Sequence, residues 1–167
     1  MSTQKTIFGS LDKYEKGSIE IIDDDPKAYV FSNIFEVANM SKPYEKVAVA
    51  MNLQYVIEAL RTEGDSKWFT ASHDEFVVCM DGELEVHLVK LNNHETFAPE
   101  DKEGSIQLNE EPVGKKMGRI VLKHGHQALL PKGAAYKFSN SGNPGVVMLQ
   151  TIKGDHTVEK WSEICYS

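Results

Sequence analysis

Short apolar runs separated by turn-forming residues dominate the sequence from residue 47 onward. The runs are rich in β-branched and aromatic residues, which favour strands. In the stretch 83–88 polar and apolar residues alternate, so Glu85 and His87 share one face of a strand and apolar side chains share the other. We expect strands at 47–53, 54–60, 67–71, 75–80, 83–91, 118–124, 126–131, 134–140 and 145–154. Many short strands at this spacing predict a β-sandwich or β-barrel.

The first 45 residues have a different pattern. An alternating run at 18–22 ends at an acidic turn. The segment 31–43 fits a short helix, with Ser32 as its N-cap and Pro43 beyond its end. A second short helix is expected at the end of the chain, around Trp161.

This division predicts two parts. We expect residues 1–45 to form an arm that packs on the barrel or on another chain, and residues 46–167 to form the barrel. Phe31, Ile34 and Phe35 supply the apolar side of the arm, so they are the candidate partner contacts.

The linker between the two groups of strands, 92–116, is polar and acidic. We expect a long loop there, with a short strand at 105–108. The charged part, 94–111, is either a docking surface or a solvated loop.

Composition narrows the class of protein. The chain has 167 residues, of which 41% are hydrophobic and 26% charged, as is typical of one globular domain. A net charge of −7 without a basic cluster argues against nucleic acid as a partner. No apolar run suits a signal peptide or a membrane span. The two cysteines, Cys79 and Cys165, fit free thiols in a reducing compartment, so we expect a cytoplasmic protein.

Two stretches carry acidic, glycine and proline residues at fixed spacing. The anchors are Glu75 and Gly82 in the first, and Gly125, Pro131, Gly133 and Asn140 in the second. This arrangement resembles the paired motifs of the cupin superfamily. The resemblance implies an all-β, cupin-type jelly-roll barrel, here with an N-terminal arm and short helices.

The same resemblance also implies metal ligands, and most of these are missing. The histidine of the second motif falls on Tyr136. The two histidines of the first motif fall on Phe69 and Ala71, or on Trp68 and Thr70 with the alternative spacing. A non-haem Fe(II) site needs two imidazoles and a carboxylate on one face. We therefore expect no metal site in this chain.

A narrower resemblance covers 51–91 and 118–138. These stretches are similar to the small subunit of two-component hydroquinone 1,2-dioxygenases. The resemblance implies that Fe(II) sits in a larger cupin subunit and that the complex opens hydroquinone with O₂ to 4-hydroxymuconic semialdehyde. It also implies a heterotetramer with two copies of each chain. This chain would be a non-catalytic subunit that stabilises and completes the large one.

Four residues are candidates for lining the substrate pocket, namely Trp68, His73, Glu75 and Tyr136. Each has a structural alternative. Trp68 is a stacking surface for an aromatic ring or part of the core. His73 and Glu75 are a residual metal pair or a hydrogen-bonded polar pair. Tyr136 is a phenolic donor in the pocket or fills the space that a lost metal leaves.

Two other functions stay open. The chain is alternatively a stand-alone metallo-cupin enzyme that uses His73, Glu75 and one of His124 or His126. The second alternative is a metal-free cupin that binds a small molecule or acts as an interaction module.

Overall fold

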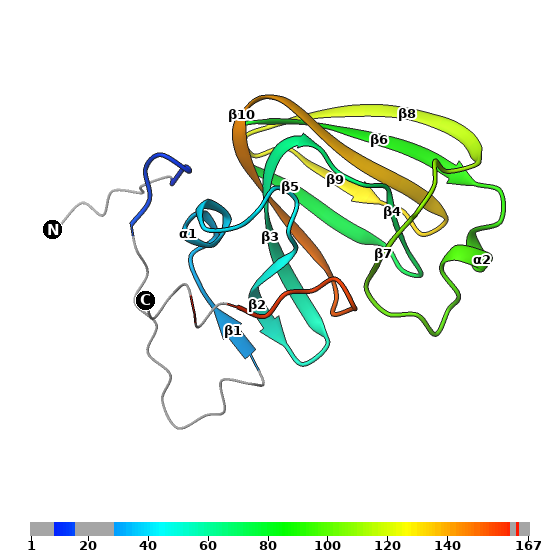
Figure 1. Ribbon diagram of the computed structural model, residues 1–167, viewed down its shortest axis with the longest axis horizontal. Helices are drawn as coiled ribbons and strands as arrows, with labels where there is room; N and C mark the ends of the chain where they lie inside the picture. Colours follow the sequence, from blue (N-terminus) through cyan, green and yellow to red (C-terminus); the bar gives the residue numbers. More distant parts are fainter. Residues whose placement is uncertain (1–8, 16–28, 161–162, 164–167) are drawn as a thin grey trace, which may run out of the picture.

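The computed structural model describes residues 9–15, 29–160 and 163. Its strands form a ten-stranded sheet whose strand pairs are all antiparallel and which curls into a barrel (Figure 1). The described elements are, in chain order, β1 (Tyr29–Phe31), α1 (Ile34–Asn39), β2 (Val47–Asn52), β3 (Tyr55–Asp65), β4 (Phe69–Ala71), β5 (Glu75–Asp81), β6 (Glu83–Leu91), α2 (His94–Phe97), β7 (Ser105–Gln107), β8 (Gly114–Lys123), β9 (Gln127–Leu130) and β10 (Ala134–Ile152). The predicted all-β cupin-type barrel with short helices is confirmed.

The long strand β10 holds the two walls of the barrel together. Its first part, 134–139, pairs with β6, and its second part, 145–152, pairs with β3. The second part also pairs with β5 on its other edge. The sequence predicted two strands here, and the structure joins them in one strand whose register shifts between Asn140 and Gly145.

The core follows from the alternation of the strands. In β6 and β5 every second residue is buried, and these side chains meet those of β10 inside the barrel. The buried cluster contains Val77, Val86, Phe138 and Leu149 among others. The faces predicted for the stretch 83–88 are therefore the faces that the structure shows.

The glycines of the motif lie in tight turns. Gly82, between β5 and β6, has a φ of +80°, and Gly133, before β10, has a φ of +87°. Residues with a Cβ resist this left-handed backbone. At Gly82 a Cβ would also lie 3.1 Å from Cα of Gly145. The spacing of these glycines thus marks the ends of barrel strands.

The N-cap of α1 lies one residue later than the sequence predicted. The side chain of Asn33 accepts hydrogen bonds from the backbone N–H groups of Phe35 and Glu36, so Asn33 is the N-cap. The hydroxyl of Ser32 instead donates to the carbonyl of Val49 in β2. The prediction of Ser32 as the cap was wrong because β2 offers its hydroxyl another acceptor.

The described part of the arm lies against the barrel. β1 pairs with β2, and Ile34 of α1 packs on the buried cluster of Val37, Val47 and Ala59. Phe35 is half-buried, and the structure describes the backbone of Phe31 but not its side chain. The strand expected at 18–22, Trp161 with its helix, and Cys165 lie outside the described residues.

The polar linker at 92–116 contains less irregular structure than expected. It contains α2 at its start and β7 near the predicted strand, and β7 pairs with β4. Among the described residues, no helix has the length and apolar character that a membrane crossing needs.

Candidate functional site

The candidate site is a group of polar side chains inside the barrel, at the positions that correspond to the cupin motifs. Phe69 of β4 and Tyr136 of β10 are register partners, and their ring centroids lie 6.1 Å apart. Glu75 of β5 is buried beside them, since its charge acts on the Tyr136 hydroxyl. Three motif positions therefore converge in one place.

Glu75 is held by two hydroxyl groups. Ser105 of β7 donates to its Oε1 at 2.5 Å, and Thr151 of β10 donates to the same oxygen at 2.7 Å. The other oxygen, Oε2, has no hydrogen-bond partner among the described residues. Only 1% of Glu75 is exposed, so its carboxyl group lies away from bulk solvent.

Lys46 reaches the same place from the residue before β2. Its Nζ donates to Oγ of Ser105 at 3.0 Å and lies 3.5 Å from the Tyr136 hydroxyl. The same ammonium lies 4.7 Å from the centre of the Phe69 ring, within the range of a cation–π interaction. Lys46 is 3% exposed.

A second buried carboxylate faces this ammonium. Oε2 of Glu58, in β3, lies 3.7 Å from Nζ of Lys46. Oε1 of Glu58 accepts a hydrogen bond of 2.7 Å from Thr157. Among the described residues, this group therefore combines the carboxyl groups of Glu58 and Glu75 with the ammonium of Lys46 and the phenol of Tyr136.

Burial dominates the electrostatics of this group. It raises the pKa of Glu58, and the charge of Lys46 opposes that shift. It also raises the pKa of Tyr136 well above 10, and Glu75 raises it further, so the phenol stays neutral and donates. At the edge of the group, burial and then Lys46 lower the pKa of His156, whose ring packs edge-on against Phe69.

His73 joins the group from the loop before β5. Its Nε2 lies 2.9 Å from Oγ1 of Thr151, which links it to Glu75, and 3.3 Å from the backbone N of Ile152. Which of these hydrogen bonds forms depends on the tautomer of the ring. His73, Glu75 and Tyr136 are thus brought together in one hydrogen-bonded network.

Trp68 lies on the other side of its strand. Its ring packs against Leu91, Leu108 and Ala135, and its Nε1 donates to Glu111 at 2.8 Å. Because successive residues of a strand face opposite sides, Trp68 points away from the interior that Phe69 faces. The structure therefore separates Trp68 from the other three candidates, and their contact with substrate stays a prediction.

His124 and His126 lie in the turn between β8 and β9. The backbone carbonyl of His126 accepts from the N–H of Cys79, four residues along β5 from Glu75. Four residues of a strand span roughly 13 Å, so neither histidine reaches Glu75. In the part of the chain that the structure describes, no three His, Cys, Asp or Glu side chains form a group suited to a metal ion. The iron that the cupin resemblance implies does not fit these residues.

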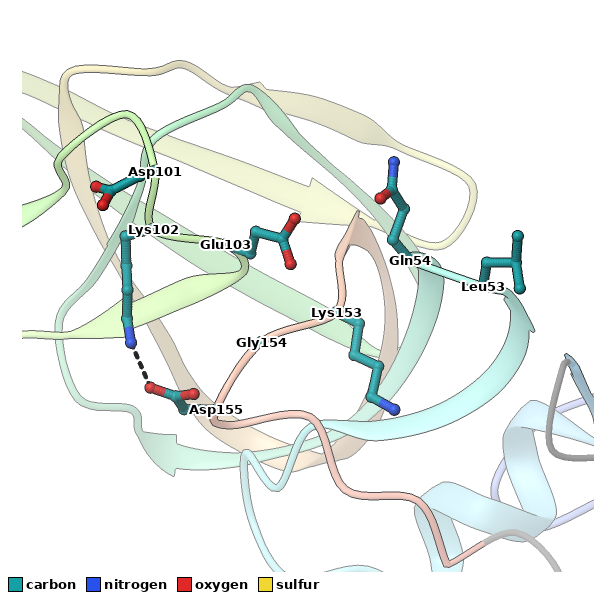
Figure 2. Close-up of a pocket in the computed structure, with 8 residues that line it drawn as sticks. All are labelled: Leu53, Gln54, Asp101, Lys102, Glu103, Lys153, Gly154 and Asp155. Atoms are coloured by element: carbon teal, nitrogen blue, oxygen red, sulfur yellow. Dashed lines mark hydrogen bonds and ion pairs between the residues drawn. The ribbon is translucent and has the colours of Figure 1, made fainter.

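The outer surface offers a separate open groove of about 760 Å³. Figure 2 shows its lining, which comes from the β2–β3 turn, the loop before β7 and the segment after β10, with an ion pair between Lys102 and Asp155. Lys102 and Asp155 are both well exposed, and such ion pairs contribute little. The groove is solvated and charged, and it lacks the buried polar groups that the barrel interior has.

Sequence reasoning missed Lys46, Glu58 and Ser105. Glu58 had a signal, because it alternates with Val56 and Leu60 on the apolar face of its strand. Lys46 lies just before an apolar run, and nothing in the sequence tells an inward lysine from a solvated one. Ser105 depends on the pairing of β7 with β4, which is a tertiary feature.

Comparisons with known proteins agree with the barrel. No protein-family model and no curated protein matches the chain. A chain in the crystal structure of hydroquinone 1,2-dioxygenase from Sphingomonas sp. TTNP3 with 4-hydroxybenzoate bound is 55% identical. The match covers 97% of both chains, with a TM-score of 0.87. A chain of hydroquinone 1,2-dioxygenase PnpCD in complex with Cd²⁺ and 4-hydroxybenzonitrile is also 55% identical, over 98% of this chain and 97% of that chain, with a TM-score of 0.83.

A different kind of chain in these enzymes shares only the fold. A chain of hydroquinone 1,2-dioxygenase PnpCD in complex with Fe³⁺ is 10% identical, with a TM-score of 0.56. The match covers 87% of this chain but 40% of that chain, which is therefore about twice as long. Solved structures of the enzyme thus contain chains of two lengths, and this chain matches the shorter kind along its whole length.

Proposed function

The chain belongs to the cupin-fold family of these hydroquinone 1,2-dioxygenase chains, and we propose that it is the small, non-catalytic subunit of a two-component Fe(II)-dependent hydroquinone 1,2-dioxygenase. The complex would cleave the ring of hydroquinone with O₂ to give 4-hydroxymuconic semialdehyde. The full-length match at 55% identity supports this proposal more than any other observation.

The interior of the barrel supports the non-catalytic part of the proposal. Phe69 and Tyr136 stand where the resemblance implies ligand histidines, and Lys46 places a positive charge between them. A cation repels a metal ion, and neither phenylalanine nor a neutral phenol is a good ligand for Fe(II). The iron of the complex would therefore belong to another subunit.

The second, longer chain supports the two-component part. It has a cupin fold like this one, and it comes from a structure of the enzyme with Fe³⁺. We propose that a chain of this longer kind is the partner, and that two copies of each form a heterotetramer.

Reconstitution tests the proposal. The full chain is co-expressed with its longer partner, and ring cleavage of hydroquinone is followed by the absorbance of the product. We expect activity from the pair and none from this chain alone. A longer subunit with full activity by itself would contradict the proposal, and so would activity of this chain by itself.

We also propose that the arm at residues 1–45 contacts the partner through the apolar surface that includes Phe31, Ile34 and Phe35. Met40, the C-cap of α1, belongs to the same arm and is 63% exposed. A large apolar side chain that is exposed on the arm fits a surface that a partner covers.

A pair of matched variants tests this interface. Met40→Asp places a charge on the arm itself, while Leu129→Asp changes a side chain of similar exposure, 54%, on β9. We expect Met40→Asp to weaken co-purification with the longer subunit and Leu129→Asp to leave it unchanged. Equal retention of both variants, or loss with Leu129→Asp only, would refute the interface.

A further inference from the structure

Two buried carboxylates share the interior of this barrel. Glu58 and Glu75 are each 1% exposed, and each has one oxygen without a hydrogen-bond partner among the described residues. The two charges act on each other, since Glu75 contributes to the electrostatic environment of Glu58. Two buried anions without a counter-charge would destabilise the fold strongly.

One cation is placed to compensate them. The ammonium of Lys46 lies 3.7 Å from Oε2 of Glu58. It reaches Glu75 through Ser105, whose Oγ accepts from Lys46 at 3.0 Å and donates to Oε1 of Glu75 at 2.5 Å. Ser105 also accepts from the Tyr136 hydroxyl at 3.3 Å. One hydroxyl therefore connects the ammonium, one carboxylate and the phenol with a consistent set of donors and acceptors.

The place of this ammonium in the barrel is informative. Phe69, Glu75 and Tyr136 occupy motif positions where a metallo-cupin would hold ligands, and Lys46 touches or is bridged to all three. The ring of Phe69 presents its face to the cation at 4.7 Å. An aromatic face and hydroxyl oxygens suit an ammonium ion and do not suit a transition metal.

We propose that Lys46 is an internal counter-ion that takes over the position and the charge of the metal ion in this barrel. The ammonium compensates Glu58 directly and Glu75 through Ser105, and it closes the interior to metal. The inference concerns the barrel of this chain alone, so it holds whichever subunit is its partner.

The experiment compares three versions of the full chain by thermal unfolding between pH 5 and pH 8.5. Lys46→Met keeps an unbranched apolar side chain that is one heavy atom shorter, and it removes the charge. The double variant Lys46→Met with Glu58→Gln removes the cation and one carboxylate together. Lys102→Met is the matched control, because Lys102 forms an exposed ion pair with Asp155.

We expect Lys46→Met to lower the melting temperature at pH 8 by roughly 10 °C or more. The loss should shrink toward pH 5, because burial raises the pKa of Glu58 and protonation of this carboxyl group removes the charge that Lys46 compensates. The other titratable groups facing the site are Tyr136, which stays neutral, and His73 and His156, which these variants retain. The double variant should recover much of the loss at pH 8, and Lys102→Met should change little at any pH.

Two results would overturn the inference. If Lys46→Met and the double variant lose the same stability at every pH, only the packing of the lysine stem matters. If added Fe²⁺ or Mn²⁺ raises the melting temperature of the unchanged chain, a metal ion binds while Lys46 is present. Lys46 then does not close the interior to metal. If Lys46→Met does not fold at pH 8, the double variant still decides, because its interior keeps one buried carboxylate, Glu75, and not two uncompensated ones.

Discussion

Ser105 is the residue through which the interior of the barrel is organised. Its hydroxyl accepts hydrogen bonds from Lys46 and Tyr136 and donates one to Glu75. This hydroxyl is buried, so bulk water reaches its three hydrogen-bond partners only if the interior opens. A serine of this kind connects the members of a buried polar network although its own hydroxyl carries no charge.

Ser105→Ala should therefore destabilise the chain more than its size suggests. The variant leaves Glu75 without one of its two donors and Lys46 without its shortest hydrogen bond. We expect a loss of about 2–4 kcal/mol in the free energy of unfolding, measured with urea. Ser72→Ala, which removes a partly exposed hydroxyl bonded to the carbonyl of Lys102, is the control and should cost less than about 1 kcal/mol. Equal losses would show that Ser105 does not organise the interior.

Cys79 should be unreactive in the folded chain. The thiol is buried in the core, and burial raises its pKa to about 11. A thiol with a raised pKa is neutral below that pH, and only the thiolate reacts with iodoacetamide. We expect mass spectrometry to find Cys79 unmodified after alkylation at pH 8.5 and fully modified after alkylation in denaturant. Rapid modification of the native chain would contradict this burial.

For single residues, the sequence predicted the places of the turn glycines better than the contacts of buried polar side chains. The spacing of Gly82 and Gly133 could be seen directly, because turns with left-handed backbone select glycine. The direction of Lys46 could not, because a long lysine side chain suits both solvent and a buried carboxylate. Its partner Glu58 lies in β3, which pairs with β2. Local sequence does not predict which strands pair.

Among the described strands, β10 is the longest and pairs with several others. It pairs with β6 in its first part and with β3 and β5 in its second. Asn140 fixes the bend between the two parts: its Nδ2 donates to the backbone oxygens of Thr62 and Asn143, and its Oδ1 accepts from the N–H of Gly142.

Asn140→Asp should loosen this bend. The carboxylate keeps the shape of the amide but replaces the donating nitrogen with an acceptor that faces carbonyl oxygens. We expect a loss of about 2–4 kcal/mol in the free energy of unfolding. Asn143→Asp is the matched control, because the network uses only the backbone oxygen of the exposed Asn143. If the Asn140→Asp variant is as stable as the unchanged chain, the bend does not depend on this amide.

The alternation of polar and apolar residues predicted the strands. It did not predict that 134–140 and 145–152 belong to one continuous strand. Residues 141–144 read as a turn, since they contain serine, glycine, asparagine and proline. In the structure the same residues stay within β10, because Asn140 ties the backbone to β3 through Thr62. The N-cap of α1 differs from the prediction for a similar reason, since β2 offers Ser32 an acceptor. Tertiary partners decide such boundaries.

At the scale of the whole molecule, the chain keeps the scaffold of a metallo-cupin and replaces its metal centre with a buried polar network. The glycine turns, the bent strand and the motif glutamate are retained, while Phe69, Tyr136 and Lys46 fill the centre. A chain with this interior suits the complex that we propose, in which a longer cupin chain would hold the iron. The resemblance predicted that division, but the sequence did not show what fills the emptied centre.

The location of iron in the assembled complex tests this account most directly. The two subunits are co-expressed, the complex is loaded with Fe²⁺ without oxygen, and native mass spectrometry measures the metal on each dissociated chain. We expect iron on the longer subunit, with this chain at the mass of its sequence alone. One iron ion per copy of this chain would contradict it.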